Sequence, residues 1–494
     1  MGVIRSQSIM NSLSAYAGIA IGYINLILLF PNFFTTEQFG LIQLLISVAE
    51  VYALVSAAGL PYSITKFFPS FRSEDKVHEG FLVYVFLITF SGYCIVTISY
   101  LLFRPLIIVA YIQNSALFID YFFILIPFSL FTLLFHVFEV IARVIYKTGF
   151  STFMREVVLR LLTTAGIVLY IAKILSFENF VIYYVTIYFI CAATILVQII
   201  ISQEFSFRLS FRHFKKKRLK EMLTYGGYTL ISSAAMQTGQ RVSALMLGSM
   251  VGLSMVGIYN LYYYLASIIY VPMKSMSRIS VTFISCAWKE NDIQKIRDIY
   301  RRTSLIQIIF GTLIYTGIII NRENLFYFIK NPEYTINFIF FPIIGVGVLI
   351  DIIAGLNSDI IGYSDKFRFD SLFNIILLAF SIAGNLILIP IMGGLGAALA
   401  FILAYFSFNF LKWLFLYRTY NLQPIDYKQL IVILLGGITF LIGEYIPVIS
   451  NVFLDIVFRS GAVTLVYMAG ILTFKISPDL NERYDVYKKK LFGN

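Results

Sequence analysis

The sequence predicts an all-α polytopic membrane protein that crosses the bilayer about fourteen times. The chain has 494 residues, of which 59% are hydrophobic and only 13% are charged, whereas soluble proteins contain about 25% charged residues. Its mean hydropathy is +0.84, and apolar runs long enough to cross a hydrocarbon core of ~30 Å recur along its length. Cations are concentrated in alternate loops between those runs. Together these observations exclude a soluble globular protein.

Hydropathy divides the chain into fourteen predicted transmembrane spans. The first six cover residues 11–31, 40–60, 80–103, 117–141, 157–176 and 180–201. The next six cover residues 223–250, 254–280, 304–321, 336–361, 370–390 and 395–417. A final pair covers residues 429–449 and 453–474.

A long polar linker between spans six and seven predicts the domain organisation. We expect an N-terminal six-helix bundle over residues 1–201, a basic cytoplasmic linker over 202–222 and a C-terminal six-helix bundle over 223–417. Residues 418–494 would add a helix pair and a cytoplasmic tail. We expect the two bundles to be pseudo-symmetric and to enclose a central cavity.

A short internal similarity is consistent with two related bundles. The second span opens with Gly40-Leu-Ile-Gln-Leu, and the eighth contains Gly257-Ile-Tyr-Asn-Leu near its start. Both halves would start on the same side of the membrane, so the repeats would be parallel and related by an axis along the membrane normal.

The positions of the cations predict the orientation. With a cytoplasmic N-terminus, only five of the 38 Lys and Arg residues fall in outer loops, and Arg241 lies within a span. The five are Arg104, Lys173, Arg322, Lys330 and Arg459. All the others fall in inner loops or at inner helix ends, which is a strong positive-inside bias. This distribution also explains the net charge of +12 without nucleic acid.

Few ionisable residues lie within the spans, and these are the candidate cavity and substrate-binding residues. Arg241 is the central one, because a charge at that depth usually faces a protein interior or a watery cavity. Glu50 lies at similar depth in the first half, and we hypothesise that the two approach each other as an outer gate or a shared charge site. Asp351 lies deeper. For Glu50 and Asp351, an interhelical hydrogen bond is the alternative role.

The set of candidate site residues is completed by two neighbours of these elements. Gln237 precedes Arg241 by one helical turn, and Lys66 follows the second span. An amide and a further cation are groups that can bind the hydroxyls and the phosphates of a polar substrate.

Three stretches resemble a known family. They are residues 28–68, residues 225–260, and residues 385–400 with the sequence NLILIPIMGGLGAALA. Together they are similar to the polysaccharide or oligosaccharide flippases, of the O-antigen type, in the multidrug/oligosaccharidyl-lipid/polysaccharide exporter superfamily. The resemblance covers nearly the whole chain in order. One departure is that the family often has an acidic residue directly before the cation of the seventh span, where this chain has Gln240.

The resemblance implies a function. It implies a transporter of the bacterial cytoplasmic (inner) membrane that flips a lipid-linked oligosaccharide of the undecaprenyl-pyrophosphate type from the inner to the outer leaflet, by alternating access, for surface polysaccharide biosynthesis. Both termini would be cytoplasmic. No cofactor is implied, and either H⁺ or Na⁺ could be the coupling ion. The partners would be membrane lipids and the substrate, with glycan polymerase machinery as an open addition.

Other functions remain open on the sequence. A cation-coupled multidrug or metabolite exporter and a lipid II flippase belong to the same superfamily. A membrane-embedded glycan polymerase or ligase is the alternative from another class, although such enzymes usually carry a large outer loop. The sequence has no GxxxxGK[ST] phosphate loop, and His78, His136 and His213 are too scattered for a metal cluster. We therefore expect no enzyme activity and no metal site.

Overall fold

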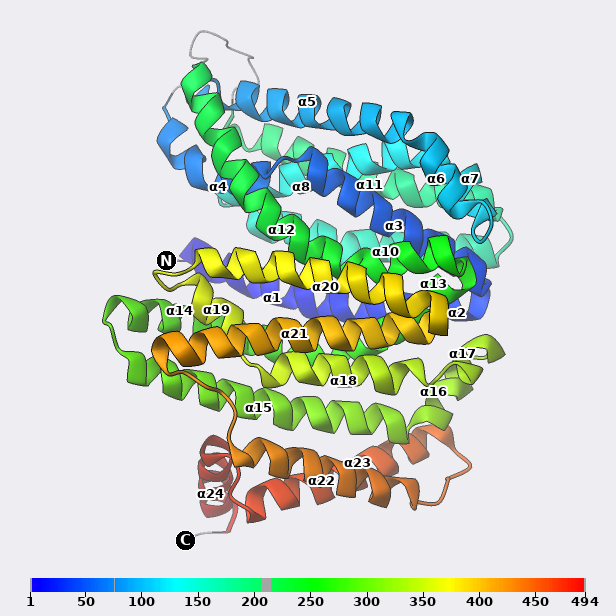
Figure 1. Cartoon of the computed structure of the whole chain (residues 1–494), viewed down its shortest axis with the longest axis vertical. Coiled ribbons are helices and arrows are strands. Elements are labelled where there is room, and N and C mark those ends of the chain that lie inside the picture. Colours follow the sequence, from blue (N-terminus) through cyan, green and yellow to red (C-terminus); the bar gives the residue numbers. More distant parts are fainter. Residues whose placement is uncertain (1, 75, 206–214, 493–494) are drawn as a thin grey trace. The chain divides into compact units, whose positions relative to one another are not determined.

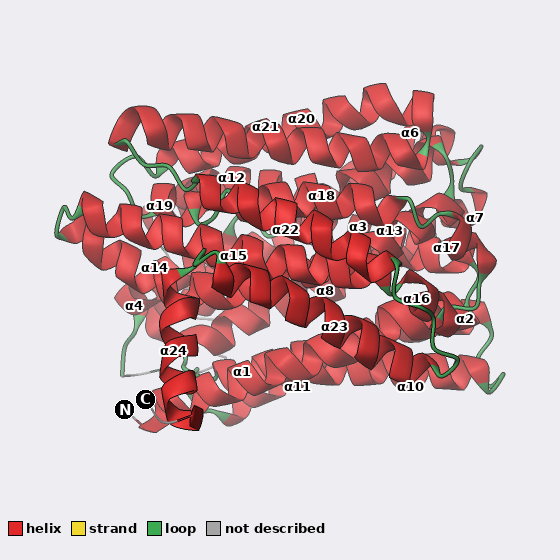
Figure 2. Cartoon of the chain, turned by 90° about the horizontal axis from the view of Figure 1, so that it is seen from below, coloured by secondary structure: helices red, strands yellow, loops and turns green. Residues whose placement is uncertain are grey.

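The chain is built from helices, as predicted. The computed structural model describes every residue except 1, 75, 206–214 and 493–494, so part of the predicted linker over 202–222 lies outside the described residues. Figure 2 shows helices joined by loops, and no strand occurs in that described part of the chain. The chain divides into two compact units, residues 1–261 and residues 262–494. The predicted boundary between the two bundles, at residues 202–222, stays a prediction.

The helices of the first unit follow the predicted spans (Figure 1). They begin with α1 (Gly2–Tyr23), the π-helical η1 (Ile24–Leu29), α2 (Phe30–Phe33), α3 (Thr36–Ser56), α4 (Leu60–Phe71), η2 (His78–Gly80) and α5 (Phe81–Leu102). There follow α6 (Arg104–Tyr111), α7 (Ala116–Asp120), η3 (Phe122–Ile124), α8 (Leu125–Val144), α9 (Thr148–Phe153), η4 (Met154–Val158), α10 (Leu159–Ile171) and α11 (Phe177–Ile201). The last are α12 (Lys216–Met250) and α13 (Leu253–Ser267), which runs across the unit boundary.

The helices of the second unit account for the remaining predicted spans. They are η6 (Ile268–Tyr270), α14 (Val271–Lys289), α15 (Ile293–Ile320), α16 (Arg322–Phe328), α17 (Pro332–Ile336), α18 (Phe340–Ile353) and α19 (Asn357–Gly362). They continue with α20 (Arg368–Met392), α21 (Gly394–Tyr420), α22 (Tyr427–Glu444), α23 (Val452–Thr473) and α24 (Pro478–Phe492).

Ten helices or helix runs within the described residues are long and apolar enough to cross a membrane. The other four predicted spans coincide with α10, α12, α13–α14 and α18. These helices are short, interrupted or more polar, because turns of 3₁₀- or π-helix and polar side chains divide their apolar stretches. A fold with ten or more membrane-spanning helices is thereby confirmed.

One cation lies elsewhere than the loop count predicted. Arg459, assigned to an outer loop, lies inside α23, is 6% exposed and donates to the carboxylate of Asp455 at 3.0 Å. It also donates to the carbonyl oxygen of Gly443 at the end of α22. The two residues are four apart on one helix face, so the charge is neutralised locally and ties α22 to α23.

Glycines let helices of the first unit approach closely. A Cβ atom added to Gly40 on α3 would lie 1.8 Å from the carbonyl oxygen of Leu253, and one on Gly257 would lie 2.4 Å from the carbonyl oxygen of Thr36. The two glycines of the internal similarity therefore face each other where α3 meets α13. Only glycine leaves room for backbone against backbone at such a crossing.

The hairpin of α20 and α21 in the second unit uses small residues in the same way. These two helices lie side by side in Figure 1. Gly393 connects them with φ of 56°, a left-handed conformation that favours glycine. A Cβ on Gly396 would lie 2.1 Å from the carbonyl oxygen of Leu388, and Ala397, Ala398 and Ala400 are fully buried. The motif of residues 385–400 thus serves helix packing.

The crossing of α3 and α13 predicts a local stability effect. We expect Gly40→Ala to destabilise the protein by about 1–3 kcal/mol, because the new methyl group must push the two backbones apart. The check is the midpoint of thermal unfolding of the purified protein in detergent. Gly227→Ala on α12 is the matched control, since a Cβ there meets nothing within 4 Å, and it should unfold at or above the wild-type temperature. Equal midpoints for the two variants would contradict the prediction.

Candidate functional site

Four helices of the first unit bring polar side chains together within the membrane-spanning region. The Glu50 carboxylate on α3 lies 3.7 Å from Nε2 of His136 on α8. Tyr188 on α11 is buried, and its hydroxyl is within electrostatic range of both Glu50 and Arg241. Arg241 lies on α12, which packs against α3. We call Glu50, His136, Tyr188 and Arg241 the first-unit polar cluster.

Arg241 has no carboxylate within 4.0 Å among the described residues of the first unit. The hypothesised ion pair between Glu50 and Arg241 is therefore not formed in this structure, where Glu50 faces His136 instead. The two charges nevertheless share Tyr188 as a neighbour. Arg241 is half-buried. An incompletely solvated guanidinium without an anionic partner favours any anionic group that reaches it.

Gln237 and Lys66 lie outside this cluster. Gln237 is exposed on α12, one turn from Arg241. Lys66 is exposed on α4, with its Nζ 3.7 Å from the ring centroid of Tyr225. Tyr225 precedes Arg241 by sixteen positions on the same helix, or about 24 Å. The structure therefore places Lys66 at the opposite end of α12, where a cation–π contact joins α4 to α12.

Asp351 belongs to the second unit and takes part in interhelical hydrogen bonds. It accepts one from the Tyr270 hydroxyl at 2.9 Å and one from Nδ2 of Asn409 at 2.8 Å. Asn409 also accepts from Nδ2 of Asn357 at 2.8 Å. These bonds connect α18, η6, α21 and α19, which is the alternative role considered for Asp351 from the sequence. They satisfy a carboxylate that is buried inside a helical bundle.

Sequence reasoning missed Lys412, because it was counted among the inner helix ends. The side chain is 0% exposed, and its Nζ donates to Ser358 Oγ at 2.6 Å and to Asp370 Oδ1 at 2.7 Å. The same ammonium group lies 4.1 Å from the centroid of the Phe408 ring. A signal was present, because Lys412 is the only charge in the apolar run FSFNFLKWLFLY of residues 406–417.

Lys412 and its neighbours form a compensated cluster. The cation is paired with Asp370 on α20, while the nearby Asp359 on α19 accepts from the Ser277 hydroxyl at 2.7 Å. A buried ion pair of this kind is costly to break on one side, because the remaining charge is left without a partner. The cluster thus holds the helices of the second unit in one arrangement, whereas Arg241 has no such carboxylate among the residues of the first unit that the structure describes.

The Lys412–Asp370 pair predicts a rescue experiment. We expect Lys412→Met to destabilise the protein by about 1–3 kcal/mol, because it removes the ammonium partner of the Asp370 carboxylate, which is 24% exposed. Adding Asp370→Asn should restore part of that loss by removing the unpaired charge. Thermal unfolding of the purified proteins measures both effects. Arg418→Met, at an exposed position of the same helix, should leave stability unchanged. A double variant no more stable than Lys412→Met would contradict this assignment.

Comparison with known families identifies the chain. The model of a family described as "Polysaccharide biosynthesis protein" matches residues 4–282, more than half of the sequence. The chain belongs to the polysaccharide biosynthesis protein family. A search of curated protein sequences finds no match.

Solved structures share the fold at low sequence identity. The lipid II flippase MurJ in an inward closed conformation matches with a TM-score of 0.76 and 15% identity, over 94% of this chain and 98% of MurJ. An inward-facing multidrug resistance MATE transporter of the MOP superfamily matches with a TM-score of 0.63 and 13% identity, over 83% of this chain and 94% of its own. The Vibrio cholerae MATE transporter VcmN matches with a TM-score of 0.50 and 12% identity, over 84% of this chain and 97% of VcmN.

These comparisons confirm the predicted class of protein. The chain is a multi-pass membrane protein of the polysaccharide biosynthesis protein family, and it has the fold of the MurJ and MATE transporters. The resemblance drawn from residues 28–68, 225–260 and 385–400 is thereby confirmed at the level of the family, and the fold of the superfamily is confirmed with it.

Proposed function

We propose that this protein flips a lipid-linked oligosaccharide, carried on undecaprenyl pyrophosphate or a similar anchor, from the inner to the outer leaflet for surface polysaccharide biosynthesis of the O-antigen type. Membership of the polysaccharide biosynthesis family is the observation that carries the proposal. A polysaccharide assembled on a membrane carrier needs a step that moves its hydrophilic part across the hydrocarbon core. A transporter fold can perform that step without covalent chemistry.

The extent of the fold likeness supports a lipid-linked substrate. The match to the lipid II flippase covers 94% of this chain, whereas the match to the MATE transporter covers 83%. A larger fraction of this chain therefore matches the protein whose name specifies a lipid-linked substrate, and this favours such a substrate over a drug or metabolite. Lipid II itself is the second candidate substrate on the same observation, and the family membership favours a polysaccharide precursor.

Cation placement supports the proposed orientation. Both termini would lie in the cytoplasm of a bacterium, with the chain in its inner membrane, because the cations of the inner loops would then follow the positive-inside rule.

The first-unit polar cluster suggests how the substrate is held. Arg241 would bind a phosphate or an acidic sugar, because its guanidinium has donors for both and has no carboxylate partner among the described residues of its own unit. Glu50, Gln237 and Asp351 would contact sugar hydroxyls or switch partners as the two halves alternate access, and Lys66 would meet the substrate near the cytoplasmic side. Either H⁺ or Na⁺ could supply the energy.

Complementation of a deletion strain tests this proposal. We expect lipid-linked oligosaccharide to accumulate at the cytoplasmic leaflet in the deletion strain and to be cleared by the wild-type gene. Arg241→Ala should lower the rate of translocation about 10–100-fold, the loss expected for a hydrogen bond to a charged group. Arg241→Lys should retain part of it, since the charge remains while the two-pronged geometry is lost.

The complementation experiment has a matched control variant and two outcomes that would contradict or change the proposal. Lys217→Ala, at an exposed position of the same helix, should behave as wild type, and membrane levels of all variants are compared by immunoblot. Normal surface glycan in the deletion strain would refute the proposal. Accumulation of lipid II in place of an oligosaccharide precursor would instead establish the second candidate.

A further inference from the structure

The second unit contains a cavity that none of the candidate site residues lines. Its volume is about 860 Å³, and it lies between α14, α15 and the C-terminal helix α24. We call it the α24 cavity. Its apolar wall comprises Pro272, Met276, Ile306, Phe310 and Val486. Pro272 and Met276 on α14 and Ile306 and Phe310 on α15 are half-buried, whereas Val486 is exposed on α24, so the cavity has an accessible apolar side.

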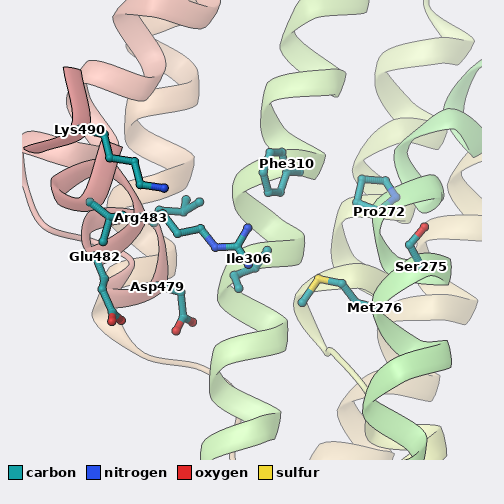
Figure 3. A pocket seen from close by; sticks show the side chains of 11 residues that line it. Pro272, Ser275, Met276, Ile306, Phe310, Asp479, Glu482, Arg483 and Lys490 are labelled. Atoms are coloured by element: carbon teal, nitrogen blue, oxygen red, sulfur yellow. The ribbon is translucent and has the colours of Figure 1, made fainter. Parts of the chain in front are cut away.

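The charged side of the α24 cavity is provided by α24. Figure 3 shows that Arg483 and Lys490 extend from α24 toward Ile306 and Phe310 of α15, whereas Glu482 points away. Arg483 and Lys490 are seven residues apart, which places them on one face of the helix. Asp479 and Glu482 also line the cavity, but the Glu482 side chain does not extend toward α15 as the two cations do.

Asp479, the second carboxylate of the cavity lining, pairs with a cation outside the cavity and holds α24 in place. The Asp479 carboxylate lies 3.5 Å from Nη1 of Arg302 on α15. At the same end of the helix, Nδ2 of Asn481 donates to the carbonyl oxygen of Leu472 on α23 at 2.9 Å. These contacts fix the start of α24 against the spans and leave Arg483 and Lys490 to meet a ligand.

The depth of the α24 cavity matches the boundary between headgroups and hydrocarbon. On α15 the charged part of the sequence ends at Arg302, and Ile306 follows one turn, or about 6 Å, further along the helix. An amphipathic helix that carries cations above an apolar wall is typical of an element lying in the membrane interface. In the orientation proposed above, this is the cytoplasmic leaflet, which carries the anionic lipids.

We propose that the α24 cavity is a binding site for an anionic glycerophospholipid of the surrounding leaflet. Its phosphate contacts Arg483 and Lys490, and its acyl chain packs on Met276, Ile306 and Phe310. The apolar wall is only one helical turn deep on α14 and on α15, so the site selects the headgroup and leaves the chain to continue into the bilayer. The bound lipid then holds α24 against α14 and α15. This site is distinct from cargo binding at Arg241, and only the identity of the leaflet depends on the proposed function.

Native mass spectrometry of the full-length protein, titrated with phosphatidylglycerol, tests the proposal. Two cations at a membrane surface contribute a factor of about five each, so Arg483→Gln with Lys490→Gln should weaken the tightest binding about 25-fold. Lys488→Gln with Arg418→Gln is the matched control, because it removes the same charge from exposed positions that do not line the cavity. It should bind as wild type does.

Further variants keep the test decisive. If loss of the two cations unfolds α24, Met276→Trp provides the second measurement, since the larger side chain covers part of the apolar wall and keeps every charge. It should weaken the same binding event. Equal affinity in all variants would overturn the proposal. Displacement of phosphatidylglycerol by equimolar undecaprenyl phosphate would also overturn it, because the cavity would then belong to the transported lipid. These results are independent of the translocation assay, so either proposal can fail alone.

Discussion

A charge within the membrane-spanning region must be matched by a partner or by water, and this constraint organises both units. The hydrocarbon core offers no hydrogen-bond partners, so the backbone is satisfied within helices and the few ionisable side chains are turned toward protein. Lys412 satisfies the constraint, because its side chain is buried and Asp370 and Ser358 accept hydrogen bonds from its ammonium group. Arg241 has no carboxylate within ion-pair distance in the described part of its own unit, where Tyr188 is an electrostatic neighbour.

Lys412 and Arg241 thus differ in whether a carboxylate partner was found for the charge among the described residues. An ammonium group that is already paired stabilises one packing of the helices and has little tendency to bind a further anion. A guanidinium without a carboxylate partner remains able to bind a phosphate, and that is the property a transporter of anionic lipid-linked sugars needs. The electrostatics of the first-unit polar cluster are therefore consistent with the proposal that Arg241 contacts the substrate.

Close helix contacts provide the frame on which these charges are placed. Gly40 and Gly257 let α3 and α13 meet backbone to backbone, and Gly396 does the same for α20 and α21. In lipid the hydrophobic effect contributes little to helix association, so close backbone contacts and interhelical hydrogen bonds determine the packing. The Asp351–Asn409–Asn357 bonds and the Arg459–Asp455 pair are of this second kind.

The sequence by itself determined the class of the protein, the positions of its helices and its family. Hydropathy is a sum over neighbouring residues, so each predicted span coincides with a helix or a run of helices. Which charges meet was decided only by the tertiary structure, because partners such as Tyr270 and Asp351 are 81 positions apart. The sequence pointed to Arg241 but paired it with Glu50, which the fold places against His136. It overlooked Lys412, because only packing decides whether a cation near a helix end reaches water or is enclosed.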